Sequence, residues 1–305
     1  SKYASYINSI STEKYGRPLV IAMSADLADS TNISGFAKGF NGSKDLGLYN
    51  YKTNQNSPLI PQGITEFTNS GMLAGLASVN FNIDPYEDFN GFFGAMSTYG
   101  SFSYLKYGPI RLFSQLAQDS NLKVGKLIWV AGHSGPETAE DSRTHFGIFA
   151  PGVTQLFPDG HIVNLYPWEH NEVAPALAAA LSTDIQIVAL HLTRPPVEIP
   201  DREKLGMASH LDASKGAYLI RNYDERSEKK GVVIVRGTSS TNSIVSLLDA
   251  LNEENLNVKI VAAISWELFS RQPEKYQNRI ISNEEWLDSM VVTNSGLRLM
   301  HRWIG

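Results

Sequence analysis

The sequence contains no cysteine, which excludes disulfide bonds, thiolate metal sites and cysteine nucleophiles. No stretch approaches the roughly 18 consecutive apolar residues of a membrane-spanning helix. Lysine and arginine number 26 against 31 aspartates and glutamates, and this net charge of −5 gives no electrostatic case for binding nucleic acid or an anionic membrane surface. Because the chain also shows no basic start followed by an apolar run, we expect a cytoplasmic protein.

Common nucleotide and metal motifs are missing as well. The chain has no G-x-x-x-x-G-K-[ST] loop, no G-x-G-x-x-G after a strand and no H-E-x-x-H. Its seven histidines do not cluster at zinc-ligand spacing on one helix. We therefore expect no metal ligands from this chain.

Apolar runs typical of strands alternate with segments of helical periodicity along the chain. The 305 residues are 42% apolar and 19% charged, as in a folded protein long enough for two domains. This alternation favours parallel sheets with helices on both faces. We expect strands at residues 18–23, 46–51, 126–131, 162–165, 185–190, 216–222, 231–235, 258–264 and 288–292, and helices at residues 3–14, 64–77, 111–117, 174–181 and 239–251.

Residues 193–213 interrupt the alternation, because Pro195, Pro196 and Pro200 remove backbone donors that a helix or sheet needs. We interpret this segment as a linker. The sequence thus predicts an α/β protein of two domains, residues 1–192 and 214–305, each built on a mainly parallel sheet with helices on both faces.

Reactive side chains concentrate at residues 131–152, directly after the expected strand at 126–131. Ligands of parallel sheets bind beyond the carboxyl ends of the strands, and a loop of about 20 residues is long enough to suggest a function. An exposed polar loop is the alternative. The segment contains His133, Glu137, Glu140, Asp141, Arg143 and His145.

Two further features have a structural and a functional interpretation. Glu66 opens an apolar helix after Thr65, the expected cap, and is either an ordinary first-turn acid favoured by the helix macrodipole or a functional carboxyl. Residues 89–113 are rich in phenylalanine and tyrosine, which either fill the core or form a flat pocket for a heteroaromatic ring.

In their order along the chain, these segments resemble the transketolase family of thiamine diphosphate enzymes. Residues 24–28 (SADLA) are similar to the family's S-A-D-L segment, and residues 64–67 (ITEF) to the segment whose glutamate activates the cofactor. His133 and His145 are twelve residues apart, like the histidines of T-H-D-S and E-D-G-P-T-H in transketolases. Residues 193–195 (TRP) fall where the family places a substrate-phosphate arginine. The resemblance implies a transketolase pyrimidine-binding domain followed by the C-terminal domain.

The resemblance also implies an activity, the thiamine-diphosphate-dependent transfer of a two-carbon ketol unit between sugar phosphates in the pentose phosphate pathway. Glu66 would bond to the pyrimidine ring nitrogen of the cofactor, and His145 would be the second catalytic residue. The cofactor-binding residues implied are Asp26, Leu27, Glu66, Tyr99 and Phe102. The substrate-binding residues implied are Lys2, Ser30, His133, Asp141, His145 and Arg194.

No Gly-Asp-Gly with a following asparagine occurs in the chain. The resemblance therefore implies that the ligands of Mg²⁺ (or Ca²⁺) and of the diphosphate come from a missing N-terminal diphosphate-binding domain or a partner subunit, in a homodimer or heterotetramer. Alone, the chain is expected to be incomplete as an enzyme.

Two alternatives to this activity remain open. Ser142 and Arg143 stand where the family has Gly-Pro, and Phe146 stands where glutamine is usual. These changes prompt a catalytically silent, transketolase-like assembly module as one alternative. The other is the beta subunit of a 2-oxoacid dehydrogenase E1, which has a similar I-T-E segment.

Overall fold

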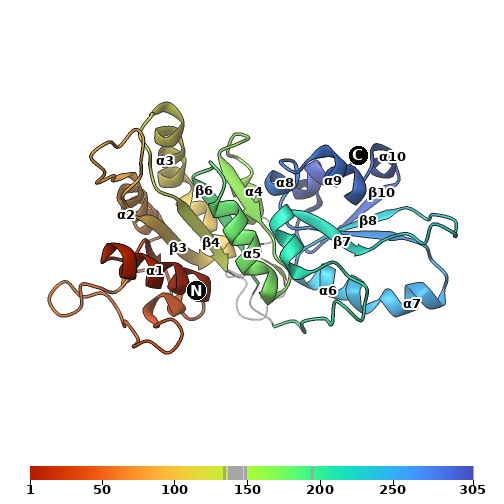
Figure 1. Cartoon of the computed structure of the whole chain (residues 1–305), viewed down its shortest axis with the longest axis horizontal. Helices are drawn as coiled ribbons and strands as arrows, with labels where there is room; N and C mark the ends of the chain where they lie inside the picture. Colours follow the sequence, from red (N-terminus) through yellow and green to blue (C-terminus); the bar gives the residue numbers. More distant parts are fainter. Residues whose placement is uncertain (133–134, 137–146, 148–149, 194–195, 305) are drawn as a thin grey trace.

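The computed structural model describes residues 1–132, 135–136, 147, 150–193 and 196–304. Two sheets organise the chain (Figure 1). The first has six strands, and all its neighbouring pairs are parallel. Its spatial order is β2 (Leu59–Ile60), β1 (Val20–Ser24), β3 (Phe93–Tyr99), β4 (Leu127–Gly132), β6 (Ile187–His191) and β5 (Ile162–Leu165).

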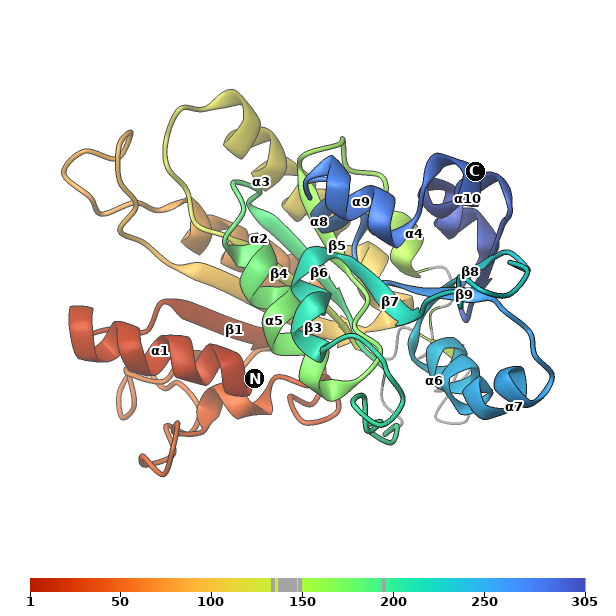
Figure 2. The same ribbon diagram turned by 45° about the vertical axis from the view of Figure 1, so that its right-hand side comes forward.

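Helices cover both faces of this first sheet, each through its own apolar cluster. Leu73, Ile110 and Trp129 belong to a cluster under α2 and α3, whereas Ala4, Val130 and Ala176 belong to a cluster under α1 and α5. Figures 1 and 2 show α1 and α5 in front of the strands. The helices of this unit are α1 (Lys2–Tyr15), α2 (Glu66–Ser78), α3 (Tyr107–Asp119), α4 (Ala150–Thr154) and α5 (His170–Leu181), with short 3₁₀ segments η1 (Ser34–Ala37) and η2 (Gly100–Lys106).

The second sheet has four strands and is mixed. Its order is β10 (Ser289–Thr293), β8 (Val232–Arg236), β9 (Lys259–Ala263) and β7 (Ala217–Arg221), and only β7 runs antiparallel to its neighbour. The remaining elements of this unit are α6 (Thr238–Ser246), α7 (Leu248–Glu253), α8 (Trp266–Phe269), α9 (Glu274–Ile280), α10 (Asn283–Leu287), η4 (His210–Lys215) and η5 (Leu297–Trp303). The predicted fold class is confirmed. The division into domains at residues 192 and 214 stays a prediction.

Two local expectations were wrong. Residues 46–51 form no strand, because Leu46 and Leu48 are exposed and their carbonyl oxygens accept hydrogen bonds from the Asn54 side chain at 2.6 and 2.8 Å. The edge strand is β2, farther along the chain. The helix expected at 239–251 is divided at Leu247 into α6 and α7.

The segment between the sheets is held by a buried cluster of charges. Arg202 Nη2 donates to Glu169 Oε1 at 2.9 Å and to Glu172 Oε1 at 2.8 Å. The Tyr218 hydroxyl of the second unit also donates to Glu172, and itself accepts from Trp168 Nε1 at 2.7 Å. Residues before, within and after the segment therefore share one network.

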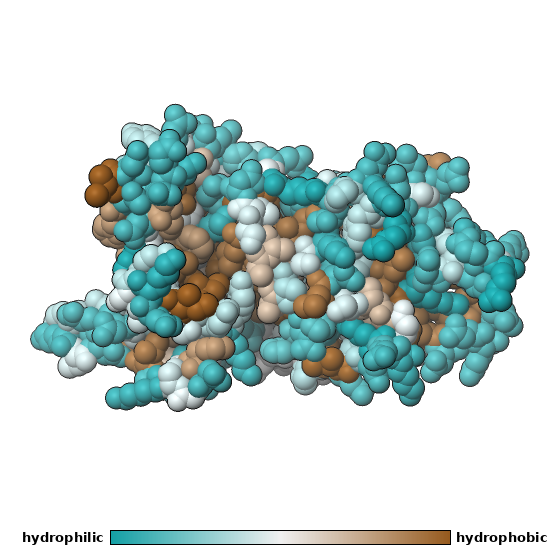
Figure 3. All heavy atoms as spheres, viewed as in Figure 1, coloured by the Kyte–Doolittle hydropathy of each residue, from teal (hydrophilic) through white to brown (hydrophobic). Residues whose placement is uncertain are grey.

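The surface in Figure 3 is hydrophilic over most of both units, but apolar atoms gather beside α1. A groove of about 680 Å³ lies there between α1 and the loop before β3, lined in part by Ile7, Ile10, Phe89 and Phe93. Within the described ranges, no helix is both long and apolar enough to cross a membrane.

Candidate active site

A buried carboxyl lies where α2 begins. Glu66 is the first residue of α2 and is only 7% exposed, although an acid in a first helical turn ordinarily remains in water. Its Oε1 accepts a hydrogen bond from Thr98 Oγ1 at 2.9 Å, while no donor from the described part of the chain reaches Oε2. Thr65 occupies the N-cap position as expected, but its hydroxyl makes no capping bond.

The composition of α2 explains this close approach. The helix is rich in small residues, and Ala74 and Ala77 pack in the same cluster as Met96 of β3. Small side chains let the helix axis come near the sheet, so its first turn meets the carboxyl end of β3. There Glu66 gains from the positive end of the helix dipole.

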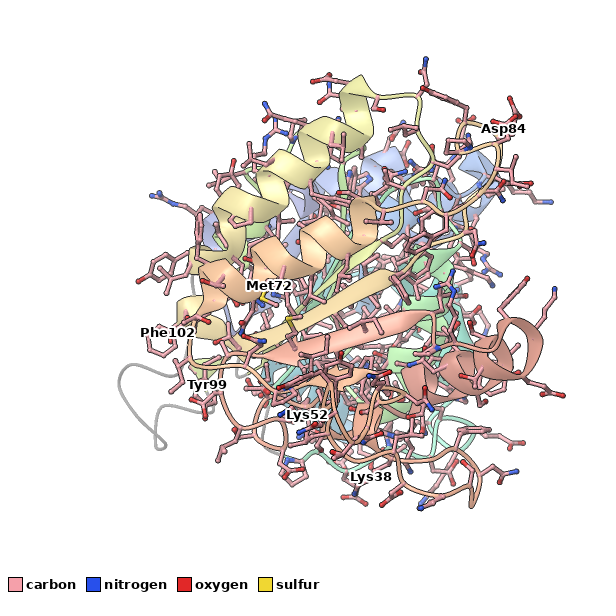
Figure 4. All side chains as sticks on the ribbon, turned by 90° about the vertical axis from the view of Figure 1, so that its left-hand side faces the viewer. Lys38, Lys52, Met72, Asp84, Tyr99 and Phe102 are labelled. Carbon is pink, nitrogen blue, oxygen red and sulfur yellow. The ribbon has the colours of Figure 1, made fainter. Side chains whose placement is uncertain are left out.

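Two aromatic side chains lie just beyond Thr98. Tyr99 is the last residue of β3 and is buried, and Phe102 follows in η2 and is half-buried. Figure 4 shows both at one edge of the molecule, past the end of the strand. A flat ring bound at this edge would have an aromatic surface beside a carboxyl oxygen.

The loop after β1 brings a third group of expected site residues to Tyr99. Ala25 N donates to Ser97 O at 3.0 Å, which ties the start of the loop to β3. Ser30 Oγ and the Tyr99 hydroxyl are 3.1 Å apart and share a hydrogen bond. Asp26 accepts from the backbone of Leu27, whose side chain is 73% exposed. The structure thus joins Ser30 to Tyr99 and leaves Leu27 facing outward.

The other expected substrate residues are less well placed or not described. Lys2 is exposed at the start of α1, where the neighbouring Ser1 Oγ donates to Asn32 O at 2.8 Å and so holds this end of the helix against the Ser30 loop. The expected residues that lie outside the described part of the chain are His133, Asp141, His145 and Arg194. Gly132, which directly precedes His133 in the chain, pairs with Tyr99 in register.

Sequence reasoning missed two residues of this region. Thr98 lies in a strand that the sequence did not predict, and Lys106 reads as an ordinary surface lysine. In the structure Lys106 is 1% exposed, and its Nζ donates to Val130 O at 2.9 Å. Burial lowers the pKa of Lys106 well below its usual range, and the charge of Glu66 opposes this shift.

Together these residues suit a flat nitrogen heterocycle better than a metal ion. A carboxyl oxygen can bond to a ring nitrogen, and the adjacent aromatic rings can stack on the ring faces. Among the described residues, no group of three histidine or acidic side chains lies close enough to hold a metal ion.

Comparisons with known families cover nearly the whole chain. Residues 7–198 match the family described as "Transketolase, pyrimidine binding domain", and residues 216–304 match the "Transketolase-like TK C-terminal domain". A probable transketolase of Schizosaccharomyces pombe is 28% identical over 293 residues, which is 94% of this chain and 38% of that protein. The Aquifex aeolicus transketolase is 27% identical over 270 residues, 88% of this chain and 34% of the relative. The chain thus spans well under half the length of these curated relatives.

Solved structures with a similar fold include the transketolase from Leishmania mexicana, with a TM-score of 0.72 at 21% identity over 99% of this chain and 39% of that one. A second is described as "Split gene transketolase, inactive beta4 tetramer", with a TM-score of 0.55 at 19% identity. That alignment covers 95% of this chain and 77% of the neighbour. At these identities the likeness concerns the fold.

Proposed function

The chain belongs to the transketolase family, and on that premise we propose that it supplies the aminopyrimidine-binding half of a thiamine diphosphate site for ketol transfer between sugar phosphates. The observation that carries the proposal is the buried Glu66 carboxyl, bonded on one oxygen by Thr98 and free of described donors on the other. A buried carboxyl with one free oxygen can form a hydrogen bond with a ring nitrogen and exchange a proton with it.

The residues around Glu66 fit the cofactor. When bound, thiamine diphosphate supplies a nucleophilic carbon that can cleave the bond next to a ketose carbonyl. Glu66 Oε2 would hold the pyrimidine nitrogen and the proton on it, Phe102 would stack on the ring, and Tyr99 would close the pocket beside it. Asp26 and Leu27 would line the remaining side.

The substrate half of the proposal rests on the family's motifs. Ser30 and Lys2, with His133 and Arg194, would hold the terminal phosphate of the sugar, where a guanidinium can bind two phosphate oxygens at once. Asp141 and His145 would bind hydroxyl groups of the sugar chain, and His145 would act beside Glu66 in catalysis.

A partner is required, because the diphosphate and its Mg²⁺ or Ca²⁺ need ligands that this chain is not expected to supply. The outward side of the candidate site offers a surface for it. Large apolar side chains are exposed on and around α2, η2 and α3, namely Ile64, Phe67, Met72, Tyr104, Leu105 and Leu112. Figure 4 faces this side and shows Met72 on the outer surface of α2. Apolar surface of this extent is typical of an interface.

The extent of the chain favours a partner subunit that carries the diphosphate-binding half. The split-gene neighbour aligns with 95% of this chain over 77% of its own length. A chain of similar extent therefore exists as one product of a divided transketolase gene. The same neighbour is described as an inactive tetramer, which favours the second candidate function, an assembly module without catalysis of its own.

One reconstitution experiment tests the proposal. The chain is mixed with its cognate diphosphate-domain polypeptide, thiamine diphosphate and Mg²⁺, and ketol transfer is measured. Glu66→Gln should lower the rate by about 10² to 10⁴, because it removes a proton-transfer group. Glu13→Gln, an exposed position on α1, is the matched control and should leave the rate unchanged. Transfer by Glu66→Gln at the wild-type rate would contradict the role, and a formed complex that transfers no ketol from any sugar phosphate would favour the assembly module.

A further inference from the structure

The Thr98 hydroxyl bonds directly to one oxygen of the Glu66 carboxyl. Thr98 lies near the end of β3, which pairs with β1 on one side and with β4 on the other. Its side chain is 1% exposed, and its Oγ1 donates to Glu66 Oε1 at 2.9 Å. A buried hydroxyl needs an acceptor, and within the described residues Glu66 Oε1 is the one acceptor that Thr98 Oγ1 reaches. The hydroxyl hydrogen therefore points at Oε1.

This hydrogen bond gives the two oxygens of Glu66 different roles. Because Oε1 accepts the hydrogen of Thr98, it does not carry the proton of a protonated Glu66. No donor from the described ranges of the chain reaches Oε2. A proton on Glu66 therefore belongs on Oε2, and in the ionised form Oε2 has unused lone pairs. In both forms, Oε2 is the oxygen that can meet a ring nitrogen.

Thr98 is also held more firmly than the carboxyl that it contacts. Its branched Cβ restricts χ1, and its backbone pairs in register with Ala131 of β4. Glu66 has three rotatable side-chain bonds and is the first residue of α2, where backbone N–H groups lack partners within the helix. Thr65 makes no capping bond to these groups, so they attract the Glu66 carboxylate back toward its own helix. The bond to Thr98 opposes that turn.

We propose that Thr98 is a positioning residue, whose hydroxyl holds Glu66 Oε1 and thereby keeps Oε2, with its proton, facing a ring nitrogen bound beyond β3. When the proton moves, the Oε2–H bond breaks and the nitrogen lone pair accepts the proton. The electron pair stays on the carboxylate, whose Oε1 remains bonded to Thr98. The identity of the ring as the pyrimidine of thiamine diphosphate rests on the proposed function.

Two substitutions separate the hydroxyl of Thr98 from its shape. Thr98→Val keeps the branched shape but has no donor, whereas Thr98→Ser keeps the donor and loses a methyl group. If Thr98 only packs in β3, the valine variant should function at least as well as the serine variant. If the hydroxyl positions Glu66, the order is reversed. Thr154→Val is the matched control, because the buried Thr154 hydroxyl of the same unit donates to Pro151 O at 2.9 Å.

The first measurement uses the full chain without partner or cofactor. Urea unfolding midpoints are compared for Thr98→Val alone and for Thr98→Val added to Glu66→Met, which has no carboxyl. Because the hydrogen bond couples the two sites, Thr98→Val should lower the midpoint of the wild type more than that of Glu66→Met. Equal shifts in the two backgrounds would overturn the inference.

The second measurement uses the complex reconstituted with the diphosphate-domain polypeptide and Mg²⁺. Calorimetry gives its affinity for thiamine diphosphate, and ketol transfer gives its rate. Thr98→Val should weaken cofactor binding and lower the rate about 10- to 100-fold, since it removes a hydrogen bond to an ionisable group. Thr98→Ser and Thr154→Val should remain near the wild type. Equal affinities and rates for the valine and serine variants would contradict the positioning role.

The outcomes distinguish this inference from the proposed function. If Thr98→Val does not fold, Thr98→Ala also removes the hydroxyl and takes its place. If the wild-type complex transfers no ketol but the serine variant binds the cofactor more tightly than the valine variant, the proposed function fails and the positioning role stands. If the complex is active and the two variants do not differ, the positioning role fails alone. A complex that binds no thiamine diphosphate would overturn both.

Discussion

The ion cluster between the two sheets should contribute strongly to the stability of the protein, because its charged groups are buried. Replacing Arg202 by methionine keeps the length of the side chain but removes its charge. The carboxylates of Glu169 and Glu172 are fully buried and both lie within 3 Å of Arg202 Nη2, at 2.9 and 2.8 Å. Two negative charges would remain inside the protein without a cation. Breaking a buried pair in this way costs about 3–5 kcal/mol of unfolding free energy.

An arginine in an exposed ion pair, Arg271, serves as the control for this substitution. Arg271 of the second unit pairs with Asp184 of the first at 2.9 Å, but the two side chains are 44% and 81% exposed. An exposed pair contributes about 0–1 kcal/mol, so Arg271→Met should be nearly neutral. Urea unfolding followed by tryptophan fluorescence measures both variants. At a denaturant dependence of about 3 kcal/mol per M, Arg202→Met should lower the midpoint by roughly 1 M or more.

A rescue separates charge from packing, because Arg202 also stacks over the rings of Trp168 and Tyr218 at 5.7 and 5.2 Å. Adding Glu172→Gln to Arg202→Met removes one stranded carboxylate and should recover part of the loss. Arg202→Met as stable as Arg271→Met would refute the assignment of this cluster as the charge contact that joins the units. A loss that Glu172→Gln does not reduce would show that the stacked rings, not the charges, account for it.

Two further predictions concern stability. The pKa of His191, lowered to about 3 by burial, Arg236 and Lys106, lies below its unfolded value of 6.5, so its contribution is complete above pH 6.5 and is lost as the pH falls toward 3. Between pH 7 and 4.5 the wild type should lose about 2 to 3 kcal/mol of unfolding free energy that His191→Gln does not lose, whereas the exposed His301→Gln should follow the wild type. Gly216→Ala should cost more than about 3 kcal/mol by thermal unfolding, because φ is +84° and a Cβ would lie 2.3 Å from Phe269 N, whereas Gly206→Ala, with φ +66° and open space, should cost about 1 kcal/mol.

The sequence was informative where local and tertiary preferences agree. The strand at residues 162–165 has the predicted limits, and β4 is displaced by one residue, because apolar and β-branched runs between turns suit a buried parallel strand. It failed at β3, where Gly94, Ala95 and Ser97 are weak strand formers. Burial between β1 and β4 determines that strand, and no local window contains this information.

The candidate site was likewise predictable only in part: its residues could be named from the sequence, but their contacts could not. The resemblance to the transketolase family indicated Glu66, Asp26 and Ser30 separately, each from its own segment. Only the fold shows that Ser30 bonds to Tyr99 and that Glu66 bonds to Thr98, contacts between residues 69 and 32 positions apart. Tyr99 and Thr98, the partners in these hydrogen bonds, could not be predicted because both lie on β3, a strand that was not expected.

The burial of Lys106 is visible only in the folded structure. In the sequence it stands between Leu105 and Tyr107, where a lysine normally points into solvent. It is buried because η2 turns back over the carboxyl ends of β3 and β4, whose Met96 and Val130 carbonyl oxygens replace water around the ammonium. Since parallel strands end at one edge, the turn that buries this cation also brings it to the face that holds Glu66. The cost of burying this side chain among neutral groups is therefore set by the tertiary fold, because the two carbonyl oxygens that receive its hydrogen bonds come from strands that no local pattern brings together.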